Sequence, residues 1–102
     1  MWLLKTAVDA DPVFTFRILP GSIKTIGRSA GAEFIVDAGL VSRLHCQLTA
    51  GAAELAVVDL ESTNGTFVNG QRITRATLKE GDRLGVGRVE LIVSRCPGAP
   101  GK

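Results

Sequence analysis

The sequence predicts an all-β fold, a β-sandwich of two antiparallel twisted sheets. No segment repeats apolar residues at the helical spacing of i, i+3, i+4 and i+7. Instead, short β-branched or aromatic runs recur about every ten residues, bounded by Gly, Pro, Asp and Asn. Roughly ten short strands do not fit one flat twisted sheet in a chain of this size, so two packed sheets are expected.

The strands follow one another along the chain, each ended by turn-forming residues. The expected strands are residues 2–8, 13–19, 23–27, 33–36, 45–49, 55–60, 66–68, a weaker one near 71–73, 82–86 and 89–95. The opening run "MWLLKTAV" is read as a strand and not a signal peptide, because Asp9 and Asp11 follow it without a small-residue cleavage site. In "VFTFRIL", Phe14, Phe16 and Ile18 face one way and the residues between and beside them face the other, so one of the two sides is expected to be core.

The turns between these runs carry the residues that tight turns require. They are "DADP", "LPGS", "SAGA", "DAGLVSR", "AGAAE", "ESTNG", "VNGQ" and "LKEGD". Asn-Gly occurs twice, at Asn64-Gly65 and Asn69-Gly70. The second pair is expected to close a short hairpin after "TFV", because both residues tolerate positive φ. The first pair is expected to present polar groups to a ligand.

The composition indicates one globular domain with no strong charge bias. The chain has 102 residues, 45% hydrophobic and 22% charged, with a net charge of +2. We expect a monomeric domain over residues 1–95, followed by the Gly/Pro-rich "CPGAPGK" at 96–102 as the start of a linker within a larger chain. The small charge makes nucleic acid an improbable partner, and no run is long enough for a membrane helix. The lone Cys46 and Cys96 suggest no metal, no cofactor and an intracellular protein.

Three loop clusters carry the residues suited to binding an anion. They are "IGRS" at 26–29, "VSRLHC" at 41–46 and "ESTNGTFVNG" at 61–70. The guanidinium groups of Arg28 and Arg43 match the geometry of a phosphate, and Ser42 adds a hydroxyl donor. Asn64 offers both a donor and an acceptor, which suits the backbone of an extended peptide.

Each cluster alone has a plainer interpretation. A Gly-Arg pair at a strand end usually leaves the Arg solvated, Ser and Asn are ordinary turn residues, and a lone His at a strand start is usually structural. Ser42 and His45 as nucleophile and base of a hydrolase are disfavoured, because no motif supplies an acidic partner and no G-x-S-x-G is present. The basic residues of the second half form a solvated face, or alternatively extend the positive field of the site: Arg72, Arg75, Lys79 and Arg83.

Taken together and in this order, the clusters resemble the forkhead-associated (FHA) domain, a β-sandwich that reads phosphothreonine. The resemblance covers Leu3 to about Val93 and includes "LKEGDRLGVG", where FHA domains have a Gly-Asp turn before the last two strands. The matching positions are Gly27, Arg28, Ser42, His45, Thr63, Asn64, Gly65 and Thr66.

The resemblance implies a role for each of these side chains. Arg28 and Ser42 would hold the phosphate, with Arg43 as a second cation beside it, and Thr63 and Asn64 would hold the peptide backbone. The remaining motif residues would be scaffold: Gly27, His45 and Gly65. The binding loops would lie at one end of the sandwich. The implied protein is a non-catalytic docking module for a phosphothreonine-containing partner.

Two questions stay open at this level. The start "MW", "ILPG" before "SIKTIGR" and "TLKEGDRLGVG" before "VELIV" are weakly similar to the amino-terminal FHA domain of nibrin, a DNA-break repair adaptor, which would imply a nuclear protein. The compact "LTAGAAELAVVDLESTNGTFVN" and the Ala and Gly content equally favour a cytoplasmic bacterial protein in a Ser/Thr kinase pathway. The alternative function is an FHA-like assembly or oligomerisation domain that needs no phosphate.

Overall fold

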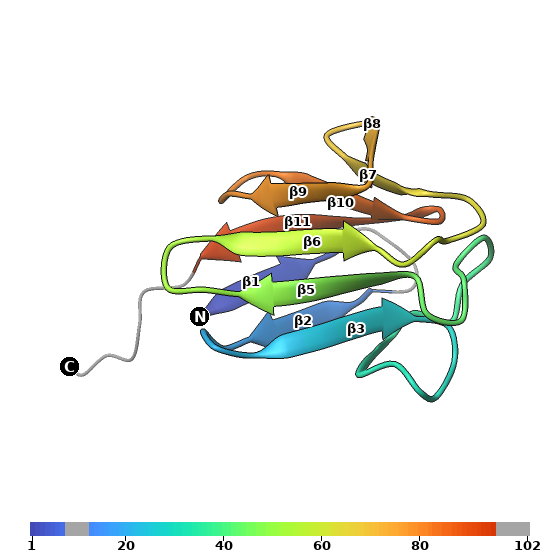
Figure 1. The fold of residues 1–102 in the computed structure, drawn as a ribbon, viewed down its shortest axis with the longest axis horizontal. Helices are drawn as coiled ribbons and strands as arrows, with labels where there is room; N and C mark the ends of the chain where they lie inside the picture. The colour runs from blue at the N-terminus through green and yellow to red at the C-terminus, as the bar shows by residue number, and fades with distance from the viewer. Residues whose placement is uncertain (8–12, 96–102) are drawn as a thin grey trace.

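The computed structural model describes residues 1–7 and 13–95, which form two sheets packed face to face (Figure 1). The six-stranded sheet has the order β2-β1-β11-β10-β7-β8, and the five-stranded sheet has the order β4-β3-β5-β6-β9. The strands are β1 Trp2–Lys5, β2 Thr15–Ile18, β3 Ile23–Gly27, β4 Phe34–Ile35, β5 Cys46–Ala50, β6 Leu55–Asp59, β7 Thr66–Val68, β8 Gln71–Ile73, β9 Arg75–Leu78, β10 Arg83–Val86 and β11 Val89–Arg95. The all-β sandwich is confirmed.

The core lies between the two sheets and consists of the inward-facing side chain of every second strand residue. In β1, Trp2 and Leu4 are buried and Lys5 is exposed. The buried core residues are Trp2, Leu4, Ile18, Ile26, Val36, Val41, Cys46, Leu48, Ala50, Leu55, Val57, Leu78, Leu84, Val86, Leu91 and Val93. The ring of Phe16 on β2 stacks on Phe34 of β4 with centroids 4.6 Å apart, which joins the two sheets at one side.

Most of the expected strands form within one or two residues of their expected bounds. One strand was missed, β9, because "RATL" is short and lacks the β-branched enrichment of its neighbours; pairing of Leu78 with Leu55 and of Ala76 with Val57 recruits it into the sheet. β4 also departs from the antiparallel expectation, since it pairs parallel with β3.

Some expectations fall on residues that the structure does not describe. The end of the first expected strand and the "DADP" turn lie largely within 8–12, and the tail 96–102 with Cys96 also lies outside the described residues. Within the described part, no helix has the length and apolar character needed to span a membrane.

The three polar loop clusters lie at one end of the sandwich (Figure 1). The connections after β3 and before β5, and the one between β6 and β7, emerge there, as does the β10–β11 turn. Gly27, the last residue of β3, allows the first two loops to touch: a Cβ at this position would lie 1.9 Å from the carbonyl oxygen of Arg43. The close approach of two backbones therefore requires glycine here.

Candidate functional site

An open cavity of about 510 Å³ lies between the loops at this end. It is lined by Arg28, Asp37, Ala38, Gly39, Leu40, Val41, Ser42, Thr63 and Asn64. Four of the five side chains expected to contact a ligand line it, contributed by three separate connections. Cavities of this size are typical of ligand sites in proteins.

Arg28 is fixed to the opposite loop by backbone and side-chain hydrogen bonds. Its backbone N–H donates to the Ser42 carbonyl at 2.9 Å, and its Nε donates to the Val41 carbonyl at 2.9 Å. The guanidinium has five N–H donors, and its terminal nitrogens make no hydrogen bond to any described residue. The Nε bond holds the side chain against the loop before β5.

Ser42 and Asn64 connect the loop before β5 to the loop before β7. The backbone N–H of Thr63 donates to Ser42 Oγ at 3.0 Å, so the serine hydroxyl keeps its own hydrogen to donate elsewhere. The Nδ2 of Asn64 donates to the carbonyl of Leu40 at 3.1 Å. The second N–H of Asn64 Nδ2 and the Asn64 Oδ1 make no hydrogen bond within the described residues.

His45 lies behind the cavity, fully buried, and joins the same two loops. Its Nδ1 accepts the backbone N–H of Ser42 at 3.1 Å, so the proton of the neutral ring is on Nε2, which donates to the carbonyl of Gly65 at 2.8 Å. Both ring nitrogens are thus occupied by backbone groups. His45 cannot act as a base toward the Ser42 hydroxyl in this geometry, which removes the basis for a hydrolase.

The carboxylate of Asp59, which no sequence motif indicated, stabilises the turn that contains Asn64. Asp59 Oδ1 accepts hydrogen bonds from Ser62 Oγ at 2.5 Å and from Thr66 Oγ1 at 2.7 Å. Ser62 Oγ in turn accepts the backbone N–H of Gly65 at 3.0 Å. Partial burial opposes ionisation of Asp59, but the hydrogen bonds from Ser62 and Thr66 outweigh it and lower its pKa. Asp59 gave no signal in the sequence because it only ends a strand.

Leu40, in the cavity wall, has an unusual backbone conformation and is contacted by two other segments. Leu40 has φ of 70°, a conformation that is costly for a residue with a Cβ. Asn64 bonds its carbonyl from one side. Gly87, in the β10–β11 turn, packs on the other: a Cβ there would lie 2.9 Å from the carbonyl carbon of Leu40 and from the carbonyl oxygen of Gly39. Neither Leu40 nor Gly87 was expected to belong to the site.

Arg28 is the one basic side chain among the described residues that line the cavity. Arg43 is exposed and does not line it, while its carbonyl accepts the backbone N–H of Ser29 at 3.2 Å. The Arg72 side chain packs against Gly65, because a Cβ on Gly65 would lie 2.8 Å from Arg72 Nε. Asp37 is a carboxylate in the cavity wall, so an anion would be favoured on the Arg28 side.

Cys46 is a core residue without nucleophilic character. It is fully buried next to His45, and burial raises the pKa of its thiol to about 12. The reactive species of cysteine is the thiolate. Cys46 therefore supplies packing and no chemistry.

Sequence comparison places the chain in one family. The family model described as "FHA domain" matches residues 24–87, well over half of the chain. The chain is 35% identical over 78 residues, 76% of its length, to the ABC transporter ATP-binding/permease protein Rv1747 of Mycobacterium tuberculosis. It is 33% identical over 75 residues, 74% of its length, to the glycogen accumulation regulator GarA of the same species. These matches span 9% and 46% of the two relatives, so the chain spans less than half of either protein.

Solved structures agree with this assignment. The FhaA FHA domain, solved in complex with the intracellular domain of Rv3910, superposes with a TM-score of 0.81 at 31% identity, over 91% of this chain and 99% of that one. An FHA domain from a study of phosphothreonine-dependent FHA domain interactions gives 0.80 at 30% identity, over 94% and 97% of the two chains. On this fold and this sequence match, the chain belongs to the FHA-domain family.

Proposed function

We propose that this domain binds phosphothreonine-containing peptides and thereby mediates phosphorylation-dependent protein–protein interactions. The observation that carries the proposal is the convergence of Arg28, Ser42 and Asn64 on one open cavity, each already fixed by hydrogen bonds to a neighbouring loop. FHA domains are interaction modules, and the similarity to an FHA domain studied for phosphothreonine-dependent interactions supports the choice of ligand.

The phosphate would be held by Arg28 and Ser42. A phosphate ester carries about −1.5 to −2 charges at neutral pH and presents three strong acceptor oxygens. The terminal guanidinium nitrogens of Arg28 and the hydroxyl of Ser42 are donors for these oxygens. Arg43 would approach from the rim as a second cation, because its side chain is exposed and lies outside the cavity lining.

The peptide backbone would be held by the turn at Thr63 and Asn64. The free N–H and Oδ1 of Asn64 match one C=O and one N–H of an extended peptide. The groups packed behind this turn would fix its shape: Gly27, His45, Asp59, Ser62 and Gly65. Binding of a peptide would then cost little conformational entropy of the loops, because the loops are already ordered.

The expected affinity is micromolar at the strongest. Three or four charge-assisted hydrogen bonds, each worth about 1.5 to 3 kcal/mol, offset an association cost of about 4 kcal/mol or more. The most favourable remainder, four bonds of about 3 kcal/mol less about 4 kcal/mol, is about −8 kcal/mol, which corresponds to a Kd near 1 μM. Affinity in this range suits reversible signalling.

Binding of the phosphate should depend on Arg28. Fluorescence anisotropy would measure binding of a degenerate peptide library with a fixed central phosphothreonine, and of its unphosphorylated twin. The wild-type domain should bind only the phosphorylated library, and Arg28→Ala should weaken that binding about ten-fold or more, since a charge-assisted hydrogen bond is lost. Arg28→Lys should recover only part of the loss, because an ammonium cannot reproduce the planar fork.

Arg17→Ala is the matched control. Arg17 is an exposed arginine on β2, beside Ile18, which pairs with Trp2 far from the cavity. The Arg17→Ala variant should bind the phosphorylated library as tightly as the wild-type domain does. Equal binding of both libraries by the wild-type domain would instead support the alternative, an FHA-like assembly or oligomerisation domain that needs no phosphate.

We propose that the partner is a phosphoprotein in a bacterial Ser/Thr kinase pathway and that the domain is an intracellular monomer. The curated relatives reported above are mycobacterial, and one is named a regulator. The free, buried thiol of Cys46 is consistent with a reducing compartment. A bacterial location would be cytoplasmic, and size-exclusion chromatography with light scattering tests the monomer.

A further inference from the structure

The β10–β11 turn is part of the wall of the cavity, although it belongs to the six-stranded sheet. Val86 pairs with Val89, so the turn consists of Gly87 and Arg88. Gly87 has φ of 61° and packs on the backbone of Gly39 and Leu40 and on the side chain of Val41, three residues that line the cavity. Glycine at the first central position with positive φ is typical of a type II′ turn, which is a tight two-residue connection.

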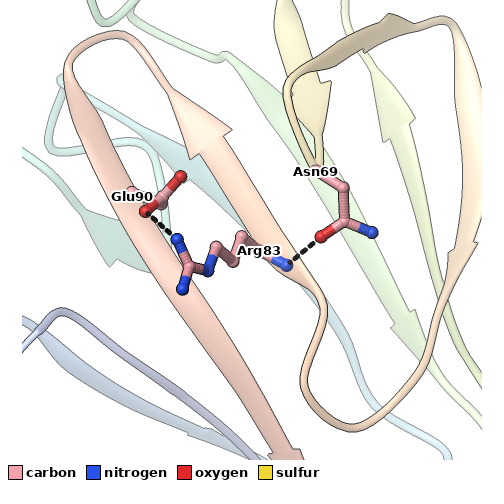
Figure 2. Close-up of polar contacts among 3 residues, drawn as sticks. All are labelled: Asn69, Arg83 and Glu90. Carbon is pink, nitrogen blue, oxygen red and sulfur yellow. Dashed lines mark hydrogen bonds and ion pairs between the residues drawn. The ribbon is translucent and has the colours of Figure 1, made fainter.

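Arg88 therefore lies beside the cavity rim. It is exposed, and no described residue forms a hydrogen bond or ion pair with its side chain. Its neighbours in the cavity wall, Gly39 and Leu40, carry no charge. The nearby carboxylate Glu90 is instead placed against Arg83, 3.7 Å away (Figure 2). Arg88 is thus a cation on a two-residue turn beside the candidate site, and no described carboxylate forms an ion pair with it.

We propose that Arg88 is a specificity-determining residue that selects phosphopeptides with an acidic side chain next to the phosphothreonine. This inference rests on the proposed function, because it needs a peptide in the cavity. A peptide that leaves the cavity over Leu40 passes the Gly87-Arg88 turn. A guanidinium pairs with a carboxylate through two parallel hydrogen bonds, so an Asp or Glu at that point would be favoured.

The test compares two phosphothreonine libraries that differ only in their flanking positions. One contains Asp and Glu, and the other contains the isosteric Asn and Gln. The wild-type domain should prefer the acidic library by roughly two- to five-fold, the range of an exposed ion pair. Arg88→Glu should abolish or reverse this preference, whereas Arg88→Lys should retain part of it, because an ammonium keeps the charge without the planar fork. Scanning Asp through single positions should concentrate the effect at one or two of them.

Arg17→Glu is the control for the effect of net charge on peptide binding. It makes the same change of charge at an exposed arginine beside the other end of the sandwich, so it should leave the preference intact. Equal loss in Arg17→Glu and Arg88→Glu would overturn the proposal, because the effect would then be nonspecific. A wild-type domain that binds both libraries equally would also overturn it while leaving the proposed function standing, and binding to neither would overturn both.

Discussion

At the scale of single residues, the arrangement of the site depends on a glycine, Gly27. Gly27 lets the strand β3 pass against the loop before β5 at a distance that any Cβ would prevent. This contact sets where Arg28, the next residue, emerges. Its backbone bond to the Ser42 carbonyl is made across the same gap.

We predict that Gly27→Ala destabilises the domain by about 1 to 3 kcal/mol or more, the usual range for overpacking. The added methyl would meet the Arg43 carbonyl oxygen at 1.9 Å, and a backbone atom cannot rotate away. Urea unfolding followed by tryptophan fluorescence measures the change, because Trp2 is the single tryptophan and is buried.

Gly31→Ala is the control for this substitution. A Cβ on Gly31 would meet its nearest atom, Ser29 Oγ, at 3.5 Å, an ordinary contact. Its stability should stay within about 0.5 kcal/mol of the wild type. Equal effects of the two substitutions would show that the close approach at Gly27 is not what the domain depends on.

At the scale of elements, the turn between β7 and β8 is closed by local chemistry and then fixed to β10. Asn69 and Gly70 have φ of 52° and 84°, which identifies the two-residue type I′ hairpin that the second Asn-Gly predicted. Figure 2 shows Asn69 Oδ1 accepting the backbone N–H of Arg83, at 3.0 Å. The Asn69 N–H donates to the Arg83 carbonyl at 2.8 Å, and Nδ2 bonds Asp82 Oδ1 at 3.2 Å.

Two substitutions at Asn69 should separate backbone strain from hydrogen bonding. Asn69→Gly loses the side-chain hydrogen bonds but also removes the Cβ from a position of positive φ, so it should cost about 1 kcal/mol or less. Asn69→Ala loses the same bonds and keeps a Cβ at positive φ, so it should be about 1 kcal/mol less stable than Asn69→Gly. Urea unfolding of both variants checks the order. If the two variants were equally stable, the turn would not depend on the conformation of residue 69.

At the scale of the whole molecule, polar bonds join the two sheets at both ends of the sandwich. Trp2 Nε1 on β1 donates to the Gly51 carbonyl in the β5–β6 turn at 3.1 Å. At the site end, Asp59 of β6 accepts from Thr66 of β7, in the opposite sheet, at 2.7 Å. The Asp59 bond therefore links the fold to the site directly, since the Thr63-Asn64 turn lies between these two residues.

We predict that Asp59 makes the domain less stable in acid. Its pKa is lowered in the folded state, so the unfolded state binds more protons and stability rises with pH. The stabilisation should be complete above the ordinary aspartate pKa, about 3.9, and should be lost as pH falls through the lowered folded value. Urea unfolding between pH 7 and pH 2 should show this loss in the wild type.

Asp59→Asn provides the comparison. It should be less stable than the wild type at pH 7, by about 1 kcal/mol for a weakened, partly buried hydrogen-bond network. Its stability should fall less steeply below pH 4, because residue 59 no longer titrates. Identical acid profiles for the two proteins would assign the acid sensitivity to other carboxylates.

The sequence alone determined the features that depend on local chemistry. The alternation in "VFTFRIL" fixed the buried side of β2, and the positive φ tolerated by Asn69-Gly70 fixed the hairpin. Residue types suited to phosphate indicated a site of Arg28, Ser42 and Asn64, because donor geometry and charge belong to the side chain itself.

Only the tertiary structure decided what depends on contacts between distant segments. β9 forms because β6 offers it an edge, and Asp59 and Gly87 matter because they pack under loops that are far away in the chain. Arg43 has a suitable side chain, yet the folded loops place it outside the cavity lining. Local patterns encode conformation and donor type, whereas the position of a group in a site is set by packing between sheets that no short stretch of sequence contains.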